Sequence, residues 1–83
     1  MYDLKLFALS TCIWCRKTIE HLNDMGFKYE LIYVDQLNGE ARKQTMKELE
    51  SFNPSRSFPT LIINGRHVIV GYKPEEIKAA LQK

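Results

Sequence analysis

The sequence predicts an α/β protein of order βαβαββα, in which a four-stranded mixed sheet is flanked by helices on both faces. In the first half, a strand pattern, a helix pattern and a second strand pattern follow one another, as in a parallel βαβ unit. In the second half, Asn64-Gly65 joins two apolar runs, which is the strongest short signal for an antiparallel hairpin. One sheet covered on both faces would bury the apolar side of every predicted helix.

The first half of the chain gives the parallel unit. Residues 4–8 alternate as a strand does, and Thr11 is expected to cap a helix from about Cys12 to Met25, which Gly26 ends. Residues 29–34 are strand formers of nearly continuous apolar character, which is typical of a central strand covered on both faces. We expect this strand to pair parallel to the first.

The second half gives a helix, the hairpin and a last helix. A helix is predicted over residues 40–52, and the polar run 53–57 ends it. Strands are predicted over 61–63 and 68–70, and Pro74 suits the first position of the closing helix. The apolar faces of these two helices consist of Met46, Leu49 and Phe52, and of Ile77, Ala80 and Leu81.

Length and composition are typical of one small globular domain, and we expect residues 1–83 to form it. The net charge of +2 is spread along the chain without a basic stripe, so we expect no nucleic-acid or membrane-surface partner. No apolar run approaches the ~20 residues that span a bilayer, and Asp3 and Lys5 interrupt the beginning of the chain where a signal peptide would be apolar. We therefore expect a cytoplasmic protein that acts as a monomer.

Both cysteines of the chain lie in the motif Cys12-Ile13-Trp14-Cys15. A disulfide that closes so short a loop constrains the unfolded chain little, so a purely structural role is the weaker interpretation. In a reducing compartment, closely spaced cysteines are more often catalytic or metal-binding.

The two cysteines are expected to differ in acidity. Cys12 lies at the predicted start of the helix, where free backbone N–H groups and the positive end of the helix dipole favour a thiolate. Arg16 and Lys17 add positive charge nearby, whereas Cys15 lies on the apolar face, where burial disfavours an anion. We interpret Cys12 as the nucleophile that forms a mixed disulfide and Cys15 as the thiol that resolves it.

Two features beside the cysteines leave alternatives open. Trp14 either contacts an incoming chain or packs against the sheet. Arg16 and Lys17 form either a solvated helix face or a recognition surface.

The strand–Cys-x-x-Cys–helix start, the segment Phe58-Pro59-Thr60 and the turn Gly71-Tyr72 resemble glutaredoxins, which have a thioredoxin-like fold, over essentially the whole chain. The resemblance implies a thiol–disulfide oxidoreductase that carries electrons to disulfide-containing client proteins, with no cofactor and no metal site. It also implies that Pro59 is cis and offers the backbone of Phe58 to an extended substrate. The substrate-binding candidates are Thr11, Trp14, Arg16, Phe58, Pro59, Gly71, Tyr72 and Lys73.

Several features depart from a typical glutaredoxin. Ile13 and Trp14 replace the usual Pro-Tyr, and Leu9 stands where a basic residue is common. Lys73 stands where an acid would hold the glutamyl end of glutathione, and the segment 35–59 is longer than usual. The run 71–74 is similar to NrdH-redoxins, the electron donors of ribonucleotide reductase that a flavoprotein reductase reduces. These features favour a flavoprotein or other dithiol reductase as the source of electrons, with ribonucleotide reductase as one candidate client.

Other classes fit less well. A glutathione-dependent glutaredoxin would need the contacts that are missing here, and so would a dimer that shares an iron–sulfur cluster with glutathione as co-ligand. A metal-trafficking domain with Thr-Cys-x-x-Cys would end in a strand, whereas this chain is predicted to end in a helix. His21 and His67 are too far apart in sequence for the usual pairing of ligands in a structural zinc site.

Overall fold

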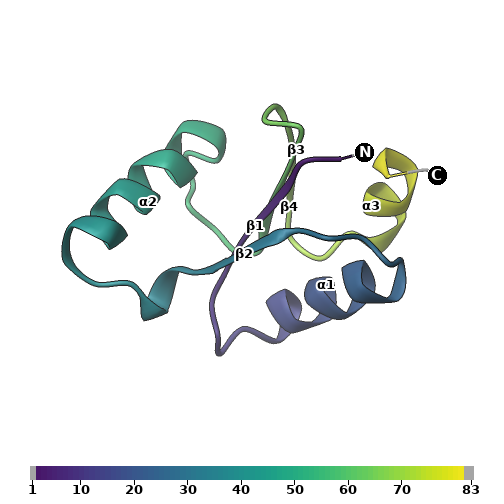
Figure 1. Ribbon diagram of the computed structural model, residues 1–83, viewed down its shortest axis with the longest axis horizontal. Helices are drawn as coiled ribbons and strands as arrows, with labels where there is room; N and C mark the ends of the chain where they lie inside the picture. Colours follow the sequence, from purple (N-terminus) through teal and green to yellow (C-terminus); the bar gives the residue numbers. More distant parts are fainter. Residues whose placement is uncertain (1, 82–83) are drawn as a thin grey trace.

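The computed structural model describes residues 2–81, which form a four-stranded mixed sheet with helices on both faces (Figure 1). This is the predicted thioredoxin-like architecture, and the predicted order of elements is confirmed. The elements are β1 (Leu4–Ala8), α1 (Ile13–Asp24), β2 (Glu30–Tyr33), the 3₁₀ turn η1 (Val34–Gln36), α2 (Gly39–Phe52), β3 (Thr60–Ile63), β4 (His67–Val70) and α3 (Pro74–Ala80).

The strands lie in the order β2-β1-β3-β4. β1 pairs parallel with β2, and β3 pairs antiparallel with both β1 and β4, as the sequence predicts. The predicted central position of the 29–34 strand is wrong, because β2 is an edge strand. Its apolar run has a different cause: Leu31 packs on one side of the sheet and Ile32 on the other, so both faces are partly covered although one edge is free.

The two faces of the sheet carry two separate apolar clusters. Because side chains of a strand alternate, Leu6 of β1 points to one cluster and Phe7 to the other. The first cluster joins the sheet to Leu22 of α1 and to Ile77 of α3. The second joins the sheet to Leu49 of α2, and Figure 1 shows this helix apart from α1 and α3.

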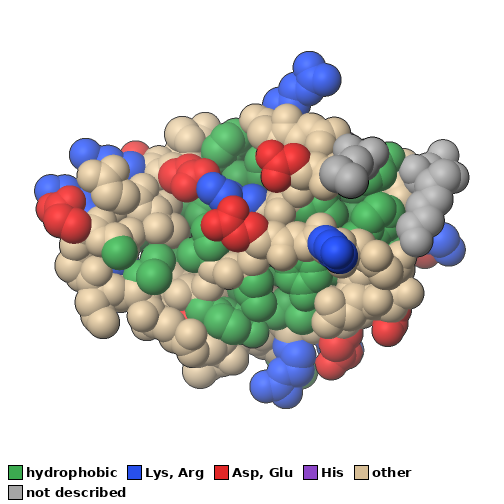
Figure 2. All heavy atoms as spheres, in the orientation of Figure 1, with side chains coloured by type: hydrophobic (Ala, Val, Ile, Leu, Met, Phe, Trp, Pro, Cys, Tyr) green, Lys and Arg blue, Asp and Glu red, His purple; other side chains and the backbone are tan. Residues whose placement is uncertain are grey.

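The distribution of surface charge and the length of the helices bear on the predicted absence of nucleic-acid and membrane partners. On the face drawn in Figure 2, acidic and basic side chains are interspersed around apolar surface and form no continuous stripe of one sign. None of the helices in residues 2–81 combines the length and the apolar character needed to cross a membrane.

Candidate active site

The two cysteines lie where β1 leads into α1, at the carboxyl-terminal end of this strand. Cys12 is the N-cap of α1, and its Sγ accepts a hydrogen bond from the backbone N–H of Cys15 at 3.3 Å. The prediction that Thr11 caps the helix is therefore wrong. Thr11 instead lies exposed in a turn that the Cys12 N–H closes on the Leu9 carbonyl at 3.2 Å. The thiol of Cys12 is one residue nearer to the first-turn amides, which explains why it takes the capping position.

The Cys12 thiol is half-buried and its pKa is lowered. Burial alone would raise it, but hydrogen bonds from the Cys15 thiol and from the backbone N–H groups of Cys15 and Trp14 outweigh burial. These hydrogen bonds, rather than the charges of Arg16 and Lys17, account for the direction of the shift. The ammonium of Lys17 instead lies 6.0 Å from the centre of the Trp14 ring.

Cys15 differs sharply from Cys12. Its side chain is fully buried, and burial is the first cause that raises the pKa of Cys15 to about 12. The hydrogen bond to Cys12 and the negative charges of Cys12 and Asp35 act in the same direction. The backbone N–H of Leu9 donates to Cys15 Sγ at 3.5 Å and opposes them. Both cysteines are free thiols, so the site is described in its reduced form.

Three aromatic side chains, Trp14, Phe58 and Tyr72, line one hollow next to the Cys-x-x-Cys motif, and we call them the aromatic wall. Trp14 is 54% exposed and stacks on Tyr72, with ring centroids 6.1 Å apart. Of the two predicted roles for Trp14, packing against the sheet is therefore wrong. A hollow of about 290 Å³ is lined by Trp14, Phe58, Gly71, Tyr72 and Lys73. Five of the predicted binding residues thus lie together, whereas Thr11 and Arg16 are exposed and do not line this hollow.

Pro59 links the loop before β3, which carries Phe58, to the loop after β4, which carries Tyr72. The Phe58-Pro59 peptide is cis, as the family resemblance implies, and Pro59 is fully buried. The carbonyl of Pro59 accepts a hydrogen bond from the N–H of Gly71 at 2.8 Å. Gly71 adopts φ = 88°, a conformation that suits glycine and disfavours residues with a Cβ.

Two polar residues at the ends of β1 and β2 were not predicted as part of the site. The carboxylate of Asp35 in η1 accepts hydrogen bonds from the backbone N–H of Ser10 at 2.9 Å and from the Ser10 hydroxyl. These hydrogen bonds are the main reason that the pKa of Asp35 is lowered. The sequence did contain a signal. Because Ala8 pairs with Tyr33 in the parallel register, the residues two positions later, Ser10 and Asp35, end level with each other.

Asn53 is a third residue that sequence reasoning treated only as the end of a helix. It is buried, and its Nδ2 donates to the Ser57 and Thr60 hydroxyls, each at 3.1 Å. Its Oδ1 accepts from the Ser55 N–H at 3.2 Å and from the Ser55 hydroxyl at 2.7 Å. The amide thereby orders the loop that leads into Pro59.

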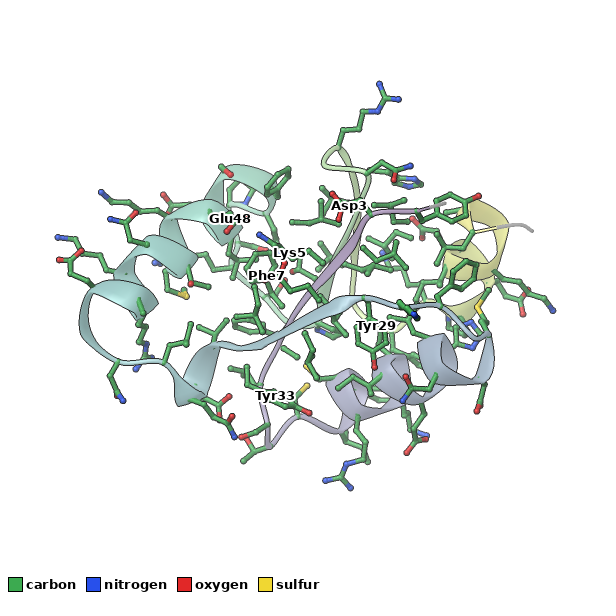
Figure 3. All side chains as sticks on the ribbon, in the orientation of Figure 1. Asp3, Lys5, Phe7, Tyr29, Tyr33 and Glu48 are labelled. Atoms are coloured by element: carbon green, nitrogen blue, oxygen red, sulfur yellow. The ribbon has the colours of Figure 1, made fainter. Side chains whose placement is uncertain are left out.

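A second hollow lies on the α2 side of the sheet and is lined in part by Asp3, Lys5 and Glu48. Figure 3 shows Lys5 and Phe7 projecting from β1 toward α2, which carries Glu48. Lys5 Nζ lies 2.6 Å from Glu48 Oε2 and 5.9 Å from the centre of the Phe7 ring. The hydrogen bond to Glu48 is the first cause that raises the pKa of Lys5. Lys5 and Glu48 therefore form an ion pair that connects α2 to β1 of the sheet.

Across residues 2–81, no three His, Cys, Asp or Glu side chains gather in a way that could hold a metal ion.

The fold and the site together define a class. A Cys-x-x-Cys pair at the start of the first helix, together with a cis-proline immediately before β3, is the arrangement of a thioredoxin-like redox protein. The family model described as Glutaredoxin matches residues 4–68, and the chain belongs to the glutaredoxin family. It is a glutaredoxin-like redox protein with a Cys12–Cys15 pair.

Individual relatives agree with this assignment. The structure of methanoredoxin from Methanosarcina acetivorans is similar with a TM-score of 0.93 and 42% identity, covering 98% of this chain and 85% of the other. An uncharacterised glutaredoxin-like 8.6 kDa protein from Clostridium pasteurianum is 29% identical over 96% of this chain and 99% of its own length. NrdH-redoxin from Escherichia coli shares the fold, with a TM-score of 0.76 and 21% identity over 98% of this chain and 97% of the other.

Proposed function

We propose that the protein reduces disulfides of client proteins by dithiol–disulfide exchange, with Cys12 as the nucleophile and Cys15 as the resolving thiol. The Cys12 thiolate attacks a client disulfide, forms a Cys12–client disulfide and releases the first client thiolate, which takes up a proton. Cys15 then attacks Cys12 Sγ, its thiol proton is transferred to the second client sulfur, and a Cys12–Cys15 disulfide remains. The client disulfide gains two electrons from the two cysteines and two protons, one from Cys15 and one from solvent, which received the proton that Cys12 lost when it ionised.

The observation that carries this proposal is the difference between the two sulfurs. Cys12 is half-buried with a lowered pKa, so an incoming disulfide can reach a thiolate there. Cys15 is fully buried with a raised pKa, which keeps it protonated and out of reach until the mixed disulfide has formed. A dithiol of this kind has to be kept reduced, so a cytoplasmic location is part of the proposal.

The role of each cysteine is tested by serine variants assayed on a disulfide-bonded protein such as insulin. Cys15→Ser should accumulate a covalent complex with the client that dithiothreitol releases, because the second thiol is missing. Cys12→Ser should lose reductase activity, because the remaining thiol is buried. Substantial turnover by Cys12→Ser would show that the roles are wrongly assigned.

We also propose that a protein dithiol or flavoprotein reductase, rather than glutathione, supplies the electrons. Lys73 supports this, because it is exposed at the rim of the hollow where an acid would be needed for the ammonium of glutathione. A like charge in place of an attractive one weakens binding by a few tenths to about 1 kcal/mol at an exposed position. A wall of Trp14, Phe58 and Tyr72 offers a docking protein apolar and aromatic surface.

Two reductant systems separate these possibilities. Turnover is measured with a thioredoxin reductase and NADPH and, separately, with glutathione and glutathione reductase. We expect the first system to be faster, and Lys73→Asp to increase the rate with glutathione. Lys47→Asp is the matched control, because it reverses an exposed charge on α2, across the sheet from the site. Efficient turnover with glutathione that Lys73→Asp leaves unchanged would identify an ordinary glutathione-dependent glutaredoxin.

A further inference from the structure

We propose that Asp35 is a positioning residue for the step in which Cys15 resolves the mixed disulfide, because its carboxylate holds the backbone segment that contacts both cysteines. The inference rests on the proposed function, in which Cys15 is the resolving thiol. It assigns a role to a residue that lies outside the Cys-x-x-Cys motif and on a different element.

The contacts form a continuous chain from Asp35 to the sulfurs. The carboxylate accepts hydrogen bonds from both the backbone N–H and the hydroxyl of Ser10. The residue before Ser10 is Leu9, whose N–H donates to Cys15 Sγ at 3.5 Å. The carbonyl of the same Leu9 accepts from the Cys12 N–H at 3.2 Å. Loss of the Asp35 carboxylate would free the segment that makes both of these contacts.

The resolving step depends on this segment more than the first step does. Cys12 Sγ accepts a hydrogen bond from the Cys15 N–H of its own helix, and Leu9 contacts Cys12 only at the backbone N–H, so attack on an incoming disulfide depends less on residues 9–10. Cys15 Sγ is fully buried, and Leu9 supplies the backbone N–H that faces it. In the resolving step, Cys15 Sγ forms a bond to Cys12 Sγ, the bond from Cys12 to the client breaks, and the client sulfur takes up the proton from Cys15. This displacement needs the two sulfurs and the leaving sulfur in line, so a small displacement of Cys15 costs rate.

The charge of Asp35 and its hydrogen bonds have opposite effects on the resolving thiol. The negative charge disfavours the Cys15 thiolate, whereas the hydrogen bonds to Ser10 hold Cys15 in place through Leu9. Asp35→Asn separates the two effects, because an amide oxygen can still accept from Ser10 while the charge is gone. A role limited to the charge would make Asp35→Asn and Asp35→Ala alike, and a positioning role makes them differ.

The test uses 5,5′-dithiobis(2-nitrobenzoate), an aromatic disulfide. Each of the two steps releases the same coloured thiolate, so absorbance reports both. Attack by Cys12 releases the first nitrothiobenzoate, and resolution by Cys15 releases the second. Reduced, desalted protein is mixed with the reagent in a stopped-flow instrument, and the rates of the two phases are fitted separately. Cys15→Ser marks the first phase, since it can release only one equivalent.

For Asp35→Ala we expect the second phase to slow by about tenfold or more while the first phase changes less than about threefold. Asp35→Asn should restore the second phase to within about threefold of the original protein. Ser10→Ala keeps the backbone hydrogen bond to Asp35 and should slow the second phase by about three- to fivefold. Glu20→Ala, which removes an exposed carboxylate from α1, is the matched control and should leave both phases unchanged.

Two results would overturn the positioning role: a second phase that Asp35→Ala leaves within about twofold, or an equal slowing of both phases. If Asp35→Ala does not fold, Ser10→Ala decides, and an unchanged ratio of its two rates refutes the proposal. Failure of the proposed function looks different, because the unmodified protein would then release one equivalent only. That result would remove the resolving step, and with it any role of Asp35 in it.

Discussion

The acidity difference between the two cysteines predicts how fast each is alkylated. Cys15 has a pKa of about 12, so about 10⁻⁵ of it is thiolate at pH 7. The pKa of Cys12 lies below its ordinary value of 9.0, so at least about 10⁻² of it is thiolate at the same pH. The reactive populations therefore differ by at least about a thousandfold.

Intrinsic reactivity reduces this ratio without removing it. A thiolate of lower pKa is a weaker nucleophile, with a Brønsted slope of about 0.4–0.5. Over three pKa units this makes the Cys12 thiolate about twenty- to thirtyfold less reactive than the Cys15 thiolate. Cys12 should then react at least about thirtyfold faster than Cys15 at pH 7, and the full burial of Cys15 adds to the difference.

The assay is alkylation of the reduced protein with iodoacetamide between pH 5 and 9, followed by fragment-ion mass spectrometry that locates the label. The rate at Cys12 should follow a titration curve whose midpoint lies below pH 9, whereas any rate at Cys15 should still rise about tenfold per pH unit there. Cys12→Ser reports Cys15 alone. Its remaining thiol loses the two raising contributions of Cys12 but keeps the larger one from burial, so it should stay slow. Equal rates at the two cysteines, or faster labelling of Cys15, would refute the reasoning.

Two predictions concern stability. Asn53→Ala removes the hydrogen bonds of a buried amide and should lower the free energy of unfolding by about 2–3 kcal/mol in urea melts, while Asn38→Ala, whose side chain makes no capping bond, should change it by less than about 0.5 kcal/mol. A small effect at Asn53 would show that the loop does not depend on this amide. Leu49→Ala should cost about 2–5 kcal/mol yet leave the alkylation rate of Cys12 nearly unchanged, because Cys12 Sγ is held by a backbone N–H of α1 and not by the cluster that contains Leu49.

Local patterns predicted the parts of the fold that local physics determines. Gly26 follows the end of α1 with φ = 78°, Asn64-Gly65 forms the turn between β3 and β4, and Pro74 begins α3. Each depends on a backbone preference of one or two residues, so one sequence suffices to locate it. The positions of Cys12 and Cys15 on α1 followed from helical spacing in the same way.

The error at the helix cap is local, because Cys12 takes the position predicted for Thr11 one residue earlier. The other errors concern features that depend on residues far apart in sequence. The apolar run of β2 shows that both of its faces are covered, but it does not show which strand lies beside it. Asp35 meets Ser10 only because β1 and β2 are parallel and in a particular register. The stack of Trp14 on Tyr72 depends on where the loop before α3 returns to the sheet. These contacts can be predicted only after the order and register of the strands are known, because the strands decide which side chains meet.

The separate apolar cluster beneath α2 has a practical consequence. The outer surface of this helix can carry a dye, a tether or an affinity tag without disturbing the end of β1 where the thiols react, because α2 and α1 pack on opposite faces of the sheet. Lys43 is exposed there and offers an attachment point. The single tryptophan of the chain, Trp14, is exposed beside the reacting thiols. It can serve as the donor for energy transfer to a fluorescent acceptor attached to α2. Client capture could then be followed in real time from the quenching of that one donor.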